Sequence, residues 1–311
     1  MQLAIAVTGL TAQQLEDYLP SLAESGATAL EVGWNLFDEL NDRQLEALAR
    51  RLHGLGLRVR SVHGPFGDAA DLSSLEEHER LKSVAAHEML LKRMPILGAT
   101  HLVIHPGNFE RKEELLPQKE ERVRRSLAAL VGTAMRAGMV LALENMLPSH
   151  PGSHPERLLA LVREHSCAGL GICFDTGHAH VLKSELATLA QLSPFLVSVH
   201  LSDNDTWTDA HLQPPYGTVD WLSLLPALAR TGYTQPLTIE TAPWGGAQPS
   251  LMVAEVKALL NSSLAAAGLP AEPWPRLASF DGQSAWLRCH RCHHFVLETE
   301  QGQACGCGER L

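Results

Sequence analysis

Eight short apolar runs alternate with longer segments of helical periodicity along this chain, and few architectures accept that pattern. The runs are nearly continuous in apolar residues, which is typical of parallel strands that are covered on both faces. Eight successive strand–helix units predict an α/β protein whose sheet closes into a (β/α)8 TIM barrel. The expected strands lie at 3–7, 29–34, 58–64, 101–107, 140–145, 170–177, 196–203 and 236–243.

An open, doubly wound sheet is the competing architecture. In that fold the first strand is normally followed by a glycine-rich loop that binds a phosphate. The stretch that follows the first strand here reads "VTGLTAQQ", which lacks this fingerprint. The closed barrel is therefore the favoured fold.

The segments between the runs carry the signals of amphipathic helices. Leu45, Leu48 and Leu52 recur at spacings of three and four residues, which places them on one face of a helix. Glycine often stands between such a segment and the next strand, as at Gly26 and Gly98, where a left-handed residue commonly ends a helix.

Composition divides the 311 residues into three parts. The barrel is expected to span residues 1–265. Residues 266–284 contain three prolines without a clear period, and are predicted to be a linker or a strap across the barrel. Residues 285–311 are rich in cysteine and histidine and are predicted to form a separate, zinc-ribbon-like extension.

The net charge and the N-terminal residues bear on the expected binding partners and on the expected cellular location. The formal charge is −10, from 35 acidic and 25 basic residues, which disfavours a large nucleic-acid footprint because such footprints need clustered Lys and Arg. The first residues, "MQLAIAVTGLTAQQLEDYL", show neither a basic segment nor a long apolar run. We therefore expect no signal peptide and no membrane span, and a cytoplasmic location.

Six consecutive predicted strands end in a carboxylate or an imidazole, or carry one in the loop that follows. Side chains at the carboxyl ends of barrel strands point into one shared mouth, so these groups are expected to converge. Carboxylates that share a cavity repel one another unless a cation or hydrogen bonds offset the cost. The pattern therefore predicts a divalent metal site, and mixed His and carboxylate donors accept either Zn²⁺ or Mn²⁺. The candidate ligands are His63, His105, Glu144, Asp175, His178, His200, Asp209, His211 and Glu240.

The motifs that hold these residues resemble those of the xylose isomerase-like TIM-barrel superfamily. They read "HGP" at 63, "HPG" at 105, "LEN" at 143, "FDTGHAH" at 174, "HLSDND" at 200, "DAHLQPPYGTVDW" at 209 and "IET" at 239. The resemblance covers almost the whole barrel, residues 1 to about 262. The superfamily holds sugar isomerases and epimerases as well as the trinuclear-zinc apurinic/apyrimidinic (AP) endonucleases of family 2.

The resemblance implies one of two site patterns. In the epimerase branch, one ion is held at the positions of Glu144, Asp175, His200 and Glu240. The two glutamates there also exchange protons with opposite faces of the substrate carbon, and the residue at the position of His178 touches the sugar. In the endonuclease branch, three zinc ions use all nine candidate positions, and each of the nine carries the required residue type here.

The sequence offers reasons to prefer the sugar branch. The stretch after His63, "GPFGDAADLSS", contains no Arg for probing a duplex, and the loop "GWNLFDELND" after the second strand is acidic. The sequence also departs from the pattern of sugar epimerases at one point. Those enzymes commonly carry an Arg after the seventh strand, and "SDNDTWTDA" lacks one. Glu31 and Trp34 are further candidates for lining the pocket.

The main hypothesis is a metal-dependent isomerase or epimerase of a sugar or sugar phosphate, acting through a metal-stabilised enediolate. Glu144 and Glu240 would be its acid–base pair, with His178 as a third catalytic residue. A trinuclear-zinc phosphodiesterase or AP endonuclease is the alternative, and a metal-bound regulatory module is a third. The expected partner is a small sugar-like molecule rather than nucleic acid or membrane, and a homo-oligomer is compatible with this hypothesis.

The C-terminal cysteines form a second candidate metal site. Cys289 and Cys292 make a CxxC pair, and Cys305 and Cys307 follow a short hairpin-like segment. Four thiolates around a hairpin are the ligand set of a structural zinc ribbon. This module would stabilise the C-terminus or contact a partner. It carries no information about the reaction.

Overall fold

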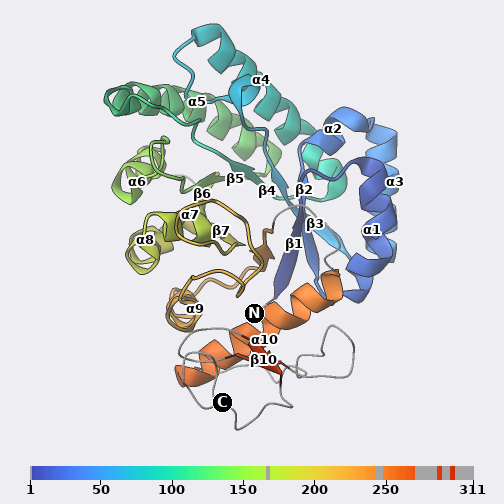
Figure 1. Cartoon of the computed structure of the whole chain (residues 1–311). Coiled ribbons are helices and arrows are strands. Elements are labelled where there is room, and N and C mark those ends of the chain that lie inside the picture. Colours follow the sequence, from blue (N-terminus) through green and yellow to red (C-terminus); the bar gives the residue numbers. More distant parts are fainter. Residues whose placement is uncertain (1, 166–168, 242–247, 270–285, 289–294, 298–311) are drawn as a thin grey trace.

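The computed structural model describes residues 2–165, 169–241, 248–269, 286–288 and 295–297. Eight parallel strands close into a barrel in sequence order, and the last strand pairs with the first. Helices surround the strands on the outside, as Figure 1 shows. The predicted (β/α)8 architecture is confirmed. The strands are β1 (Leu3–Val7), β2 (Ala29–Gly33), β3 (Arg58–His63), β4 (His101–Ile104), β5 (Val140–Glu144), β6 (Leu170–Asp175), β7 (Leu196–Leu201) and β8 (Leu237–Ile239).

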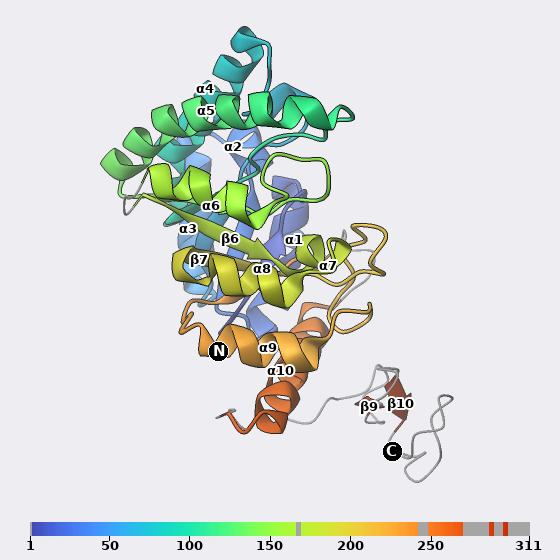
Figure 2. The same ribbon diagram turned by 90° about the vertical axis from the view of Figure 1, so that its left-hand side faces the viewer.

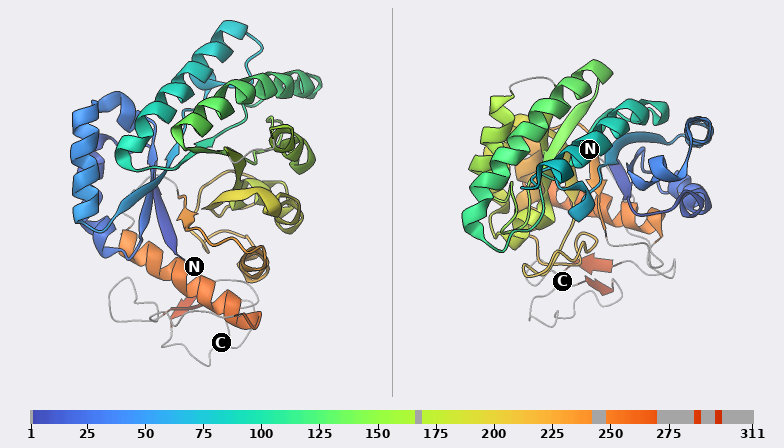
Figure 3. Two further views of the ribbon diagram at one scale, coloured as in Figure 1. Left: turned by 180° about the vertical axis from the view of Figure 1, so that it is seen from behind. Right: turned by 90° about the horizontal axis from the view of Figure 1, so that it is seen from above.

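Helices return the chain from the carboxyl end of one strand to the start of the next, and two helices lie between β2 and β3 and between β6 and β7. Figure 2 shows α6, α8 and α9 stacked along the outside of the barrel beside β6 and β7. Helix α10 packs against both α9 and α1, so it closes the helical layer where the end of the barrel meets its beginning (Figure 3). The helices are α1 (Ala12–Glu24), α2 (Asn35–Glu39), α3 (Asp42–Gly54), α4 (Glu77–Arg93), α5 (Leu116–Ala137), α6 (Pro155–Glu164), α7 (Thr176–Val181), α8 (Glu185–Leu192), α9 (Trp221–Arg230) and α10 (Pro249–Ala266).

Local signals in the sequence set the ends of these helices. Thr11 and Asn41 begin α1 and α3 with complete capping boxes, in which the side chain of the cap and that of the residue three positions later satisfy each other's backbone amides. Gly138 ends α5 with a φ of +68°, in the left-handed region that glycine enters without steric cost. The predicted apolar face of α3 is buried.

Two apolar layers support the mouth of the barrel. The larger one lies between the strands and the helices. A smaller cluster of Val103, Ala142 and Cys173, with Val197 packed against it, lies among β4, β5, β6 and β7. Ala142 and Cys173 stand two residues before Glu144 and Asp175 on the same strands, so they share the inward-facing side with those carboxylates. The described helices include none that is long and apolar enough to cross a membrane.

The predicted extension is represented by two short strands. β9 (Trp286–Arg288) pairs antiparallel with β10 (Phe295–Leu297). Cys289, Cys292, Cys305 and Cys307 lie outside the described residues. Most of the predicted linker at 266–284 lies outside them as well, so the zinc ribbon and the domain boundaries stay predictions.

Candidate metal centre

The nine candidate ligands all lie at the carboxyl ends of the strands. His63, Glu144 and Asp175 are the last residues of β3, β5 and β6. His105 and Glu240 follow β4 and β8 by one residue. Asp175 and His200 are register partners on neighbouring strands, which places their side chains side by side. His178 lies in α7, and Asp209 and His211 lie in the loop between β7 and α9.

The innermost group contains three carboxylates around one imidazole. Each of its four residues offers a donor atom within 4.8 Å of the others, and all four are buried. His200 Nδ1 lies 2.8 Å from Glu240 Oε2, 3.2 Å from Glu144 Oε1 and 3.9 Å from Asp175 Oδ2. We call Glu144, Asp175, His200 and Glu240 the inner group.

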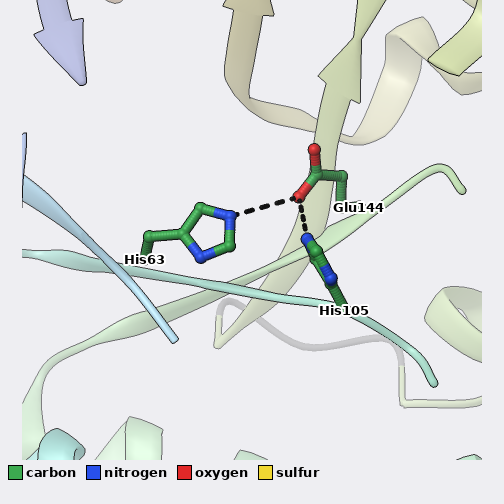
Figure 4. A group of neighbouring side chains, drawn as sticks. All are labelled: His63, His105 and Glu144. Atoms are coloured by element: carbon green, nitrogen blue, oxygen red, sulfur yellow. Dashed lines mark ion pairs between the residues drawn. The ribbon is translucent and has the colours of Figure 1, made fainter. Parts of the chain in front are cut away.

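A second group uses the other oxygen of Glu144. Its Oε2 atom lies 3.2 Å from His105 Nε2 and 3.9 Å from His63 Nε2, with both rings directed toward the carboxylate (Figure 4). Glu144 therefore belongs to two candidate sites, one for each of its oxygens. We call His63, His105 and Glu144 the middle group.

The third group stands on α7 and on the loop after β7. Asp209 Oδ2 lies between two imidazoles, 3.3 Å from His178 Nε2 and 3.0 Å from His211 Nε2. The Asp209 and His211 side chains are 23% and 28% exposed, so this group lies nearer to solvent than the inner one. We call His178, Asp209 and His211 the outer group.

The donor atoms fit a divalent cation. Asp209 Oδ1 is buried without a hydrogen-bond partner among the described residues, and the buried atoms Glu144 Oε2 and Glu240 Oε2 face imidazole nitrogens of His105 and His200. Unpaired buried carboxylate oxygens cost free energy, and a cation satisfies several of them at once. Mixed imidazole and carboxylate donors suit Zn²⁺ and Mn²⁺. Each of the three groups can therefore hold an ion.

The electrostatics of the metal-free protein point the same way. Burial would raise the pKa of Glu144, but the charge of His200 and hydrogen bonds from His105 and His200 hold it well below its usual range. Burial would also raise the pKa of Glu240, but the charge of His200 and its hydrogen bond lower that pKa to about 2. Burial acts to lower the pKa of His200, but neighbouring groups that include the Glu240 and Glu31 carboxylates raise it well above its usual value. An imidazolium thus takes the place of a cation among these carboxylates.

Asp175 has two roles in the structure. Its Oδ1 atom accepts a 2.6 Å hydrogen bond from the backbone amide of His178 and so caps α7. Its Oδ2 atom faces His200 at 3.9 Å. The helix cap and the candidate ligand are therefore one residue, and the cap fixes where His178 enters the mouth.

His180 lies away from the three groups. Its Nε2 atom lies 2.8 Å from Thr218 Oγ1, and its Nδ1 atom pairs with Glu185. Thr218 in turn donates to the backbone carbonyl of Asn204. His180 therefore anchors the loop that carries Asp209 and His211.

Two residues that the sequence analysis did not name as candidate ligands lie beside the centre. Glu31 on β2 is fully buried, and its carboxylate lies 3.2 Å from His200 Nε2. Cys173 is buried in the interior cluster, and its sulfur also lies within 4.8 Å of donor atoms of Glu144 and His200. Trp34 packs against the hydrophobic core, and Trp207 is 77% exposed with Lys183 over its ring.

A cavity of about 790 Å³ opens above the centre. Glu144, Glu240, His178 and His211 line it together with residues of the β1–α1 loop. Its described lining includes neither Lys nor Arg. The described surface of the cavity is therefore suited to an uncharged ligand that carries hydroxyl or carbonyl oxygens.

The family follows from a match of sequence profiles. The profile described as "Xylose isomerase-like TIM barrel" matches residues 19–261, which is most of the chain. This chain belongs to that family. The match confirms the resemblance of the strand-end motifs, and the xylose isomerase-like barrel accounts for every strand from β2 to β8.

Curated relatives of this xylose isomerase-like barrel are distant. The uncharacterized protein y4fM of Sinorhizobium fredii is 24% identical over 250 residues, which cover 72% of this chain and 79% of the relative. The probable endonuclease 4 of Mycoplasmoides gallisepticum is 25% identical over 202 residues, 59% of this chain and 64% of the relative. The chain thus spans less than two thirds of that endonuclease.

Solved structures share the barrel. A D-tagatose 3-epimerase-like protein matches with a TM-score of 0.76 at 22% identity, over 86% of this chain and 100% of the other. The IolI protein with a bound zinc atom matches with a TM-score of 0.72 at 17% identity, over 86% of this chain and 99% of the other. A protein from Thermus thermophilus, soaked with ZnCl2, matches with a TM-score of 0.68 at 26% identity, over 84% of this chain and 99% of the other. At these identities the likeness establishes the fold.

Proposed function

We propose that this chain is a divalent-cation-dependent epimerase or isomerase of a small, uncharged sugar or sugar-like hydroxy-carbonyl compound. The observation that carries the proposal is the pair Glu144 and Glu240. They stand at the ends of β5 and β8, line one cavity, and both face His200 Nδ1. Similar solved structures include a D-tagatose 3-epimerase-like protein and an L-ribulose 3-epimerase.

The two glutamates suit proton transfer at a carbon between them. A cation held by the inner group would act as a Lewis acid on a carbonyl and its neighbouring hydroxyl, which acidifies the adjacent C–H bond. Both pKa values lie below the usual range, so each carboxylate begins ionised and able to accept a proton. One glutamate would remove the proton from one face of the carbon. The other would deliver a proton taken up from solvent to the opposite face, and the first would release its proton to solvent. His178, on the cavity wall, is placed to bind a substrate hydroxyl.

Exchange of substrate hydrogen tests the proposal. The purified protein, loaded with Mn²⁺, Co²⁺, Mg²⁺ or Zn²⁺, is incubated in D2O with a panel of free ketoses, and deuterium at the α-carbon is followed by NMR. We expect exchange that Glu144→Gln and Glu240→Gln abolish. Glu88→Gln is the matched control, because Glu88 binds Thr133 between α4 and α5, far from the mouth in the fold. Absence of exchange with every ketose and every metal would reject the proposal.

A zinc-dependent phosphodiesterase or AP endonuclease is the second candidate. It is supported by the convergence of all nine residues into three metal groups, since a ketose epimerase needs only the inner one. The described cavity lining without Lys or Arg speaks against a phosphate-rich substrate. Cleavage of an abasic oligonucleotide, together with one zinc ion in each group, would favour this candidate. Inertness in both assays with a filled site would favour a regulatory module.

A further inference from the structure

Glu31 is a buried carboxylate inside the barrel that the proton-transfer scheme does not use. It is fully buried on β2, in a run whose other residues are apolar or glycine. Ser61 on β3 donates a 2.7 Å hydrogen bond to its Oε2 atom. Its Oε1 atom has no hydrogen-bond partner within the described part of the chain. A carboxylate in such a place needs a further partner with an N–H group or a positive charge.

His200 supplies that partner. Its ring is fully buried and has a carboxylate at each nitrogen. Nδ1 faces the three acids of the inner group, and Nε2 lies 3.2 Å from both oxygens of Glu31. Glu31 is thus on the far side of the imidazole from the candidate cation.

A neutral imidazole carries one N–H group, so it presents a lone pair to a cation at only one nitrogen. A carboxylate at the other nitrogen selects the tautomer and holds the ring in its orientation. We propose that Glu31 is a positioning residue that keeps the His200 proton on Nε2 and thereby commits the Nδ1 lone pair to the cation. This inference rests on the cation site of the proposed function and is independent of the reaction.

Glu31 has one competing role. Its donor atom also lies within 4.8 Å of donor atoms of His63 and Glu240, so it has the position of a direct ligand. The hydrogen bonds favour the positioning role. Ser61 and His200 both contact Oε2, so these contacts tie the Glu31 carboxylate to β3 and β7. A positioning residue changes how tightly an ion binds, whereas a ligand also changes how many ions bind.

The test compares Glu31→Leu and Glu31→Gln with the wild-type protein and with Glu88→Gln as the matched control. Zn²⁺ affinity and stoichiometry are measured by competition with a chromophoric chelator. Leu has a similar size but no acceptor, so we expect its Kd for the tightest ion to rise about 10- to 100-fold at unchanged stoichiometry. The amide oxygen of Gln still accepts from Nε2–H, so its Kd should rise by less than about 10-fold. The control should match the wild type.

A spectroscopic measurement keeps the test valid if the Leu variant does not fold. Long-range proton–nitrogen NMR of the zinc-loaded, histidine-labelled protein should show His200 protonated at Nε2 and metal-bound at Nδ1, in the wild type and in Glu31→Gln. Zinc at Nε2 would overturn the inference. So would an unchanged Kd in a folded Leu variant, or the loss of one whole ion from both variants, which would make Glu31 a ligand. No substrate is involved, so a failure of the proposed reaction would be seen separately.

Discussion

Glu144→Gln should weaken two metal groups with one substitution, because Glu144 is shared between them. Its Oε1 atom lies 3.2 Å from His200 Nδ1 in the inner group, and its Oε2 atom lies 3.2 Å from His105 Nε2 in the middle group. Glutamine keeps one oxygen but replaces the other with an NH2 group, which cannot bind a cation. It also removes the negative charge that both sites share.

The size of the effect follows from the burial of Glu144, which is 1% exposed. With an effective dielectric constant of about 20, a unit charge about 4 Å from a divalent ion contributes roughly 8 kcal/mol before desolvation. Desolvation of the carboxylate offsets a large part, and loss of one member of a buried charge cluster typically costs about 3–5 kcal/mol. At about 1.4 kcal/mol for each tenfold change, the Kd should rise by roughly two to three orders of magnitude.

The assay is a zinc titration followed by chelator competition and by metal analysis after gel filtration. Wild-type protein is compared with Glu144→Gln, with Asp209→Asn, which touches only the outer group, and with Glu88→Gln. Glu144→Gln should lose ions from both the inner and middle groups, and Asp209→Asn from the outer group alone. If Glu144→Gln retained the wild-type stoichiometry with Kd values within about threefold, the assignment of a shared carboxylate would be wrong.

Three further outcomes are expected. Chelation should lower the melting temperature by roughly 5–10 °C relative to protein with zinc at about 100 times its Kd, because the cation binds only the folded chain. Burial lowers the pKa of His87 to about 4 in the folded chain. Between pH 6.5 and pH 4 this histidine is therefore protonated in the unfolded chain but neutral in the folded one. Urea unfolding should therefore show a loss of up to about 3 kcal/mol as the pH falls from 6.5 to 4, and His87→Gln should reduce that loss. Asp203 accepts a 2.7 Å hydrogen bond from Trp221 at the base of the loop that carries Asp209 and His211. Asp203→Asn should therefore lower the free energy of unfolding by about 1–3 kcal/mol in the same assay and weaken zinc binding by the outer group.

The barrel could be predicted from the sequence because its signals are local and repeated. Apolar runs indicated all eight strands, and positive φ angles at Gly26, Gly56, Gly98 and Gly138 confirm the expected turns before β2, β3, β4 and β5. The ends of the strands were less accurate. β4 stops at Ile104 and β8 at Ile239, earlier than predicted, because the chain leaves the hydrogen-bonded ladder just where the functional residues begin. Strand ends depend on pairing with neighbours, which a single run does not encode.

The candidate ligands were found because they repeat one position, the strand end, in strand after strand. Glu31 was harder to place, since it stands inside an apolar run and only β7, far along the chain, brings His200 to it. His180 lies away from the three groups for a geometric reason. In a strand, His178 and His180 would face the same side, but α7 begins at Thr176, and two residues along a helix turn the side chain by roughly 200°.

The inner and outer groups differ in charge balance, and that difference bears on function. Three carboxylates surround one imidazole in the inner group, which leaves a surplus of negative charge that a bound cation would balance. In the outer group Asp209 lies between two imidazoles, so protonation of His178 or His211 neutralises it without a metal. The proposed epimerase activity would need an ion in the inner group alone, whereas the phosphoesterase alternative would need the middle and outer groups filled as well. The two proposed activities therefore differ in how many groups hold an ion, and not in which side chains the barrel presents.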